Sequence, residues 1–146
     1  MQADNNITYK TIIEKQGFFI CTPVGTSMNP LLYERKDTVK LVKAENVKKY
    51  DVILYQRKNG IFVLHRVVGK DKKGYILCGD NQFIKEYGVT DDMIIGKMEG
   101  FYKGEEYIPC DDKKYVKYYK RRVRSIPYRH FVYKVKRIIK KIIGRK

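Results

Sequence analysis

The sequence predicts a mostly β domain with a short helix before it and basic helices after it. Five segments between residues 38 and 103 are short, rich in β-branched and aromatic residues, and separated by Gly and Asn, as strands joined by turns are. The charge is uneven. Residues 1–112 hold 17 Lys and Arg against 16 Asp and Glu, whereas residues 113–146 hold 15 Lys and Arg and no acid. We therefore expect two units, a body at 1–112 and a basic amphipathic helical tail at 113–146.

Each expected element has its own signal. Ile12 and Ile13 form the apolar side of a short helix over residues 8–16, which Gly17 ends. Asn59 and Gly60 predict a type I′ hairpin turn, because that turn needs positive φ at both central positions. The segment after this turn is apolar on both faces, which predicts a central strand covered on both sides. The expected strands are 38–44, 51–58, 61–69, 74–79 and 93–103.

The tail is predicted to form two helices separated by Pro127. Apolar residues recur at helical spacing in both: Tyr115, Tyr119, Val123 and Ile126, then Phe131, Val132, Val135, Ile138, Ile139 and Ile142. Two interpretations stay open, because the apolar stripe could pack on the body or lie on an anionic membrane surface. The body is nearly neutral, so the high overall charge does not indicate a nucleic-acid binder, and we do not expect nucleic acid as a partner.

Composition excludes several classes of protein. Three cysteines without CxxC spacing, Cys21, Cys78 and Cys110, fit neither a disulfide framework nor a zinc site, and we expect no metal and no cofactor. The sequence contains no run of about 18 apolar residues, which is the length that a conventional membrane-spanning helix requires. The first residues lack the basic start and apolar run of a secretory signal. We expect a cytoplasmic protein, peripheral at the inner face of the membrane if the tail binds lipid.

Ser27 is a candidate nucleophile that needs a base. His65 lies in the expected strand 61–69, whereas His130 lies in the basic tail, where a solvated helix residue is the expectation. If the turn between strands 61–69 and 74–79 is centred on residues 72–73, His65 faces Asp80. A bulge at the start of the second strand would instead place Asn81 opposite His65.

Five ordered motifs carry a resemblance: "GTSMNP" at 25–30, "YDVILYQ" at 50–56, "LHRVVG" at 64–69, "CGDNQ" at 78–82 and "IIGKM" at 94–98. Together they resemble the signal peptidase I and LexA-like serine protease superfamily over residues 17–104. The resemblance implies the β fold of that superfamily, with Ser27 as nucleophile and His65 as general base. Bacterial leader peptidases and LexA-like proteins carry a lysine there. The histidine resembles the branch that contains endoplasmic-reticulum and archaeal signal peptidases.

The chain departs from this pattern in three respects. The acid of the histidine branch lies a few residues beyond the "GDN" motif, where this chain has Glu86, so Asp80 and Glu86 are alternative third catalytic residues. Gly25 stands where signal peptidases keep a serine for the oxyanion, so backbone N–H groups around Gly25, Thr26 and Ser27 would have to serve. Met28 is expected to pack and fix the serine turn. The N-terminal membrane span of signal peptidases is missing, and the resemblance is to stand-alone bacterial peptidases.

The resulting expectation is a serine endopeptidase that cleaves a precursor or leader peptide through an acyl-enzyme. Its partner would be a peptide or protein precursor. The alternative is a catalytically inactive protease-fold binding module that docks to an anionic membrane or nucleic acid through its tail. A self-cleaving LexA-like regulator is less favoured, because the expected base is histidine rather than lysine.

Overall fold

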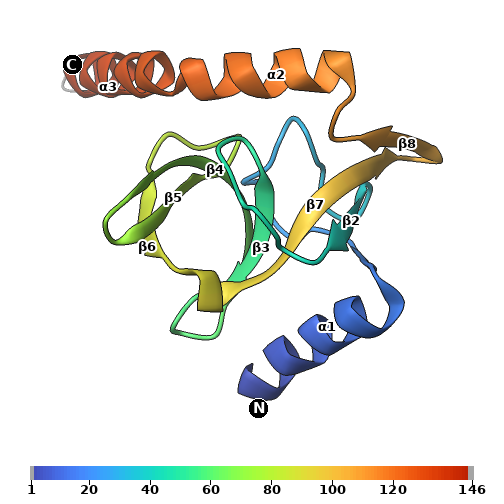
Figure 1. Ribbon diagram of the computed structural model, residues 1–146. Coiled ribbons are helices and arrows are strands. Elements are labelled where there is room, and N and C mark those ends of the chain that lie inside the picture. Colours follow the sequence, from blue (N-terminus) through green and yellow to red (C-terminus); the bar gives the residue numbers. More distant parts are fainter. Residues whose placement is uncertain (1, 145–146) are drawn as a thin grey trace.

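Eight antiparallel strands form one sheet that curls on itself, in the order β1-β2-β7-β3-β4-β5-β6, with β8 paired to β7 (Figure 1). The computed structural model describes the backbone of residues 2–144 and the side chains of residues 9–144. The helices are α1 (Gln2–Gln16), α2 (Lys113–Arg124) and α3 (Ile126–Ile143), with a 3₁₀ turn at Asp91–Met93. The strands are β1 (Phe19–Cys21), β2 (Thr38–Val42), β3 (Val52–Gln56), β4 (Phe62–Asp71), β5 (Gly74–Cys78), β6 (Glu86–Val89), β7 (Ile94–Lys103) and β8 (Glu106–Pro109).

The mostly β architecture with helices at both ends is confirmed. All five expected strands are present as β2, β3, β4, β5 and β7. Three further strands, β1, β6 and β8, were not predicted, because they have only three or four residues and are mostly exposed or half-buried. Such strands have little apolar alternation from which to recognise them. The end of the predicted tail, Arg145 and Lys146, lies outside the described residues.

Two local expectations need correction. Helix α1 starts at Gln2 rather than near residue 8, because its first turns are polar and lack the apolar pattern used to find it. The hairpin at Asn59 and Gly60 is present between β3 and β4, but only Gly60 has a positive φ, of 87°. The N–H of Gly60 donates to the carbonyl of Arg57 at 2.8 Å, so this is a wider loop than a type I′ turn.

The core has two parts. The first lies between α1, α2 and the sheet and includes Ile13, Leu32, Leu41 and Tyr115. Helix α1 approaches β7 closely because Gly96 has no side chain; a Cβ there would lie 3.0 Å from Cδ1 of Ile13. The second part consists of buried side chains from β3, β4, β5, β6 and the start of β7. Strand β4 is central, as expected, and its residues 65–67 are buried on both faces.

The pairing of β4 with β5 corrects the expected neighbour of His65. Near the turn the register is as expected, with Asp71 opposite Gly74. An irregularity between Val67 and Gly69 then shifts the register by one residue, so that Arg66 pairs with Cys78. Gly79, the residue after β5, consequently lies beside His65, in place of the expected Asp80 or Asn81.

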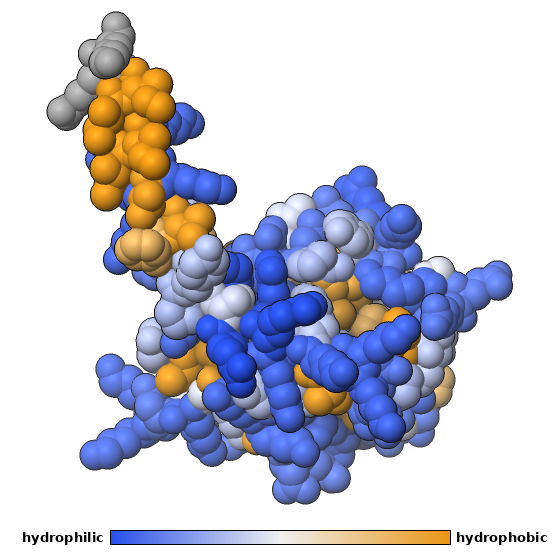
Figure 2. Space-filling view, turned by 90° about the horizontal axis from the view of Figure 1, so that it is seen from above, coloured by the Kyte–Doolittle hydropathy of each residue, from blue (hydrophilic) through white to orange (hydrophobic). Residues whose placement is uncertain are grey.

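The two helices of the tail have different surroundings. Helix α2 packs on the body: Tyr115 is buried, and the Tyr119 ring stacks on Tyr50 with centroids 4.9 Å apart. Pro127 lies in the first turn of α3, where a missing N–H costs nothing. Helix α3 extends past the body, and most of its apolar side chains are exposed (Figure 2). Packing against the body thus accounts for the apolar side of α2 and not for that of α3.

Candidate active site

Ser27 lies in the loop between β1 and β2, and Asn81 fastens this loop to the end of β5. The backbone N–H of Asn81 donates to the carbonyl of Ser27 at 2.8 Å, and its side-chain amide donates to the carbonyl of Thr26 at 3.1 Å. Met28, directly after the serine, is buried in the first part of the core. The serine is therefore held from both sides, by the buried methionine and by the "GDN" motif.

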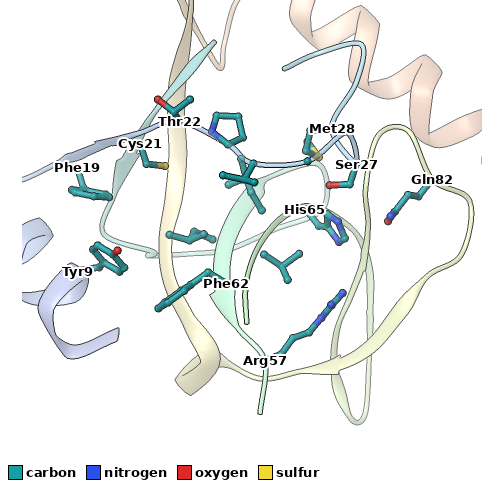
Figure 3. A pocket seen from close by; sticks show the side chains of 16 residues that line it. Tyr9, Phe19, Cys21, Thr22, Ser27, Met28, Arg57, Phe62, His65 and Gln82 are labelled. Carbon is teal, nitrogen blue, oxygen red and sulfur yellow. The ribbon is translucent and has the colours of Figure 1, made fainter. Parts of the chain in front are cut away.

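His65 and the Ser27 loop meet at Gly79. A Cβ on Gly79 would lie 2.6 Å from the carbonyl oxygen of Ser27 and 3.1 Å from Nε2 of His65. Only a glycine leaves room for the serine loop to approach the histidine this closely. In Figure 3 the Ser27 hydroxyl and the His65 ring lie next to each other at the edge of the pocket. The structure thus brings together the two residues predicted as nucleophile and base.

A pocket of about 500 Å³ opens beside this pair. Ser27, His65 and Gln82 line one end, and the remainder is largely apolar (Figure 3). Helix α1 supplies one wall through Tyr9, whose ring contacts that of Phe19 at 5.1 Å between centroids. The apolar residues that line the pocket are Tyr9, Phe19, Cys21, Val24, Met28, Leu54, Phe62, Val63 and Leu64.

A second pocket, of about 450 Å³, lies on another side of His65. The chain after Asp80, from Asn81 to Glu86, forms most of its wall. His65, Arg57 and Gln82 line both pockets, so the histidine lies between two concavities.

The other side of the histidine ring faces Tyr55, on the neighbouring strand β3. The Tyr55 hydroxyl is 3.5 Å from Nδ1 of His65, and it donates a short hydrogen bond to the Glu86 carboxylate. Arg57 holds the same carboxylate through Nε at 2.9 Å and a terminal nitrogen at 3.1 Å. Glu86 therefore reaches His65 through the Tyr55 hydroxyl.

Burial sets the protonation of this group. Loss of water around His65 lowers its pKa to about 4; the negative charge of Glu86 opposes this and the positive charge of Arg57 adds to it. The imidazole is uncharged at neutral pH. Burial also disfavours the Glu86 carboxylate, but hydrogen bonds from Arg57 and Tyr55 outweigh this and lower its pKa. A neutral imidazole next to a serine can accept a proton.

Asp80, the first of the two predicted acids, has other partners. Its carboxylate accepts two hydrogen bonds from Arg66, at 2.7 and 2.8 Å, and one from the Tyr118 hydroxyl at 2.9 Å. Arg66 in turn donates to the Tyr115 hydroxyl at 3.0 Å. This buried pair ties β4 and the "GDN" motif to α2.

One of the backbone N–H groups expected to bind the oxyanion, that of Gly25, already has a hydrogen-bond acceptor. Gly25 has φ of 91° and open space where a Cβ would lie. Its N–H donates to the Glu34 carboxylate at 2.6 Å, so in this structure it does not point at a substrate. The neighbouring N–H groups of Thr26 and Ser27 are the remaining candidates for the oxyanion. Cys21, which also lines the pocket, is an unsuitable nucleophile because burial raises the pKa of its thiol to about 11.

Sequence reasoning missed Tyr55, Arg57 and Arg66. One signal was available: Arg66 stands among apolar residues of a central strand, and a buried arginine requires a carboxylate partner. Tyr55 and Arg57 gave no such signal, since both fit an ordinary strand end. Comparison with known proteins found no family model and no curated protein that matches this chain.

Proposed function

We propose that this protein is a serine endopeptidase of the signal-peptidase-like type, which cleaves a precursor or leader peptide. The observation that carries the proposal is the meeting of Ser27 with the uncharged His65 at Gly79, at the end of an apolar pocket. The ordered motifs of the sequence support the same reading, because the five segments include the residues that meet at this point.

In the proposed mechanism His65 Nε2 takes the proton from Ser27 as its Oγ attacks the peptide carbonyl. The C–N bond then breaks, and His65 returns the proton to the leaving amine. Water, deprotonated by the same nitrogen, then attacks the acyl carbon, and the histidine returns this proton to Ser27 Oγ as the ester bond breaks. Tyr55 and Glu86 would keep the imidazole oriented, with Nδ1–H toward the hydroxyl and Nε2 toward the serine. We assign Asp80 a structural role, because Arg66 and Tyr118 occupy its carboxylate.

The oxyanion would be bound by the backbone N–H groups of Thr26 and Ser27. The Gly25 N–H could join them only after leaving Glu34, whose carboxylate it now contacts. A preorganised donor of this type lowers a barrier by about 3 kcal/mol. The geometry of the loop supports this choice, since Asn81 holds the carbonyls of both residues in place.

The two pockets fit an extended peptide that passes the histidine on both sides. The larger pocket is lined by aromatic and aliphatic side chains and suits an apolar residue of the substrate. The smaller one, between residues 81 and 86, would take the chain on the other side of the cleaved bond.

A fluorophosphonate probe, which phosphonylates activated serines with loss of fluoride, tests the proposal directly. We expect labelling of Ser27 in the wild-type chain, located by peptide mass spectrometry, and its loss in Ser27→Ala and in His65→Ala. Ser125, which also carries a hydroxyl but donates to the carbonyl of Arg122, gives the matched control Ser125→Ala, with labelling retained. Labelling that persists in His65→Ala would remove the histidine from its role. A folded wild-type chain that is never labelled would favour the inactive binding module.

A further inference from the structure

The second helix of the tail, α3, carries a continuous apolar stripe that no other part of the described chain covers. Apart from the adjacent pair Ile138 and Ile139, neighbouring members lie three or four residues apart, so all of them share one helix face. Their exposed fractions run from 36% at Val135 to 69% at Tyr128. The stripe consists of Tyr128, Phe131, Val135, Ile138, Ile139 and Ile142.

The opposite side of α3 touches the body, so the stripe points outward. Phe83 stacks on His130 and also contacts Tyr133, with ring centroids 4.9 Å apart in both cases. At 100° per residue, His130 and Tyr133 lie away from the centre of the stripe. His130 is thus a packing residue rather than the solvated one expected. Figure 2, seen from above, shows the apolar stripe on the outer side of the projecting helix.

Basic residues flank the stripe on both sides. Lys136 and Lys140 follow one edge and Lys134 and Lys141 the other, and α3 contains no acid. A second copy docked through this stripe would bring these charges together, which disfavours self-association. A bilayer with anionic headgroups would instead attract the lysines while its acyl region received the apolar side chains. None of the helices within residues 2–144 is long and apolar enough to cross a membrane.

We propose that α3 lies in the plane of an anionic lipid bilayer, with the stripe among the acyl chains and the flanking lysines at the headgroups. The junction of α2 and α3 is fastened beside the second pocket: Arg129 of α3 donates to the carbonyl of Gln82 at 2.8 Å, and Arg122 of α2 donates to that of Asp80 at 2.6 Å. When the protein is bound to the bilayer, these contacts therefore hold the second pocket at a fixed distance from the lipid surface. The docking is independent of the proposed peptidase activity, and Ser27→Ala is expected to bind vesicles like the wild type.

Vesicle flotation with the full chain tests the docking. We expect binding to vesicles of phosphatidylglycerol and phosphatidylcholine in equal parts, little binding to pure phosphatidylcholine, and weakening in high salt. Ile138→Asn with Ile142→Asn should lower the partition coefficient at least tenfold, whereas Ile61→Asn, at a similarly exposed isoleucine of the β3–β4 loop, should not. Lys134→Gln with Lys141→Gln should cost about tenfold. The matched pair Lys72→Gln and Lys73→Gln, on the β4–β5 turn, should cost little.

Three results would overturn the proposal. One is a folded wild-type chain that fails to float with anionic vesicles. Another is a chain that binds both a single-stranded oligonucleotide and the vesicles, with neither binding weakened by the two isoleucine changes. The tail would then bind polyanions through its charge alone. The third is a dimer, detected by light scattering, that the same isoleucine changes dissociate. Circular dichroism of each variant confirms that α3 is still helical.

Discussion

Two arginine–carboxylate pairs stand close to His65 and differ mainly in their exposure to water. In each, the arginine makes two hydrogen bonds to the carboxylate and a tyrosine hydroxyl makes a third. The side chains of Arg66 and Asp80 are 0% and 2% exposed, whereas those of Arg57 and Glu86 are 37% and 28% exposed. The same pairing therefore has two different effects: the buried pair holds α2 to the sheet, and the half-exposed pair lines the second pocket and shifts the pKa of His65.

The largest expected effect is at the buried pair. Arg66→Met leaves the Asp80 charge buried with only Tyr118 beside it, which should lower the free energy of unfolding by about 3–5 kcal/mol. Urea denaturation followed by circular dichroism measures this. The double change Arg66→Met with Asp80→Asn should recover a large part of the loss, because no uncompensated charge remains. A cost below about 1 kcal/mol for Arg66→Met would show that the pair is not an anchor.

Acid should destabilise the fold through His65. Its pKa falls from 6.5 to about 4 on folding, so between these values the unfolded chain binds a proton that the folded chain does not. The contribution of the neutral His65 to the free energy of unfolding is therefore fully present above about pH 6.5. It declines as the pH falls toward 4, by a total on the order of 3 kcal/mol. Glu86, whose pKa is also lowered, adds to the loss only at the acidic end of this range.

Unfolding measured from pH 7 to pH 4 checks this, with His65→Gln as the control that should have a flatter profile. Equal slopes for the two proteins between pH 7 and pH 5 would contradict burial of a neutral histidine. Labelling by the fluorophosphonate should likewise fall off near pH 4 rather than near 6.5.

The half-exposed pair should matter more for chemistry than for stability. Glu86→Gln should lower the free energy of unfolding by only about 1 kcal/mol but slow fluorophosphonate labelling roughly ten- to hundredfold, because the imidazole loses its orientation. Tyr55→Phe should have a similar effect, and the two changes together should cost little more than either alone. Additive effects would indicate that Glu86 does not act through the Tyr55 hydroxyl.

The smallest expected effect concerns Glu34. Its carboxylate lies next to the N–H of Gly25 and would oppose a developing oxyanion. Glu34→Gln should therefore raise the labelling rate about two- to fivefold, with the gain shrinking in high salt. Glu105→Gln, an exposed acid on the β7–β8 turn, is the matched control and should leave the rate unchanged. A slower Glu34→Gln variant would indicate that the carboxylate supports the loop instead.

The sequence predicted those parts of the fold in which burial leaves a periodic trace. The five long strands and both tail helices have that trace, whereas β1, β6 and β8 are too short and exposed to carry one. The shift at Val68 has no signature either, since a valine is as common in a regular strand as at an irregularity. For this reason the residue beside His65 could not be predicted by counting along the hairpin.

The candidate site likewise contains residues that sequence motifs predicted and residues that only the folded structure reveals. Ser27 and His65 came from ordered motifs, and the alternative acid Glu86 from its distance along the chain. Its link to the histidine runs through Tyr55, which is 31 residues from Glu86 in sequence. The pairing of β3 with β4 places Tyr55 near His65, and the curl of the sheet brings Glu86 of β6 to the Tyr55 hydroxyl. Contacts of this type depend on strand pairing and are outside the reach of local patterns.

The contacts of α2 and α3 with the body determine where the chain can be truncated without exposing the core. A fragment that ends at Asp112 would lose the hydroxyls of Tyr115 and Tyr118 that bond to Arg66 and Asp80, and would open the buried ion pair to water. A fragment that ends after Tyr133 keeps these groups, the Arg129 contact and the rings on Phe83, and omits most of the exposed stripe. The natural boundary for a shorter and more soluble fragment is therefore inside α3, directly after Tyr133, its last described contact with the body.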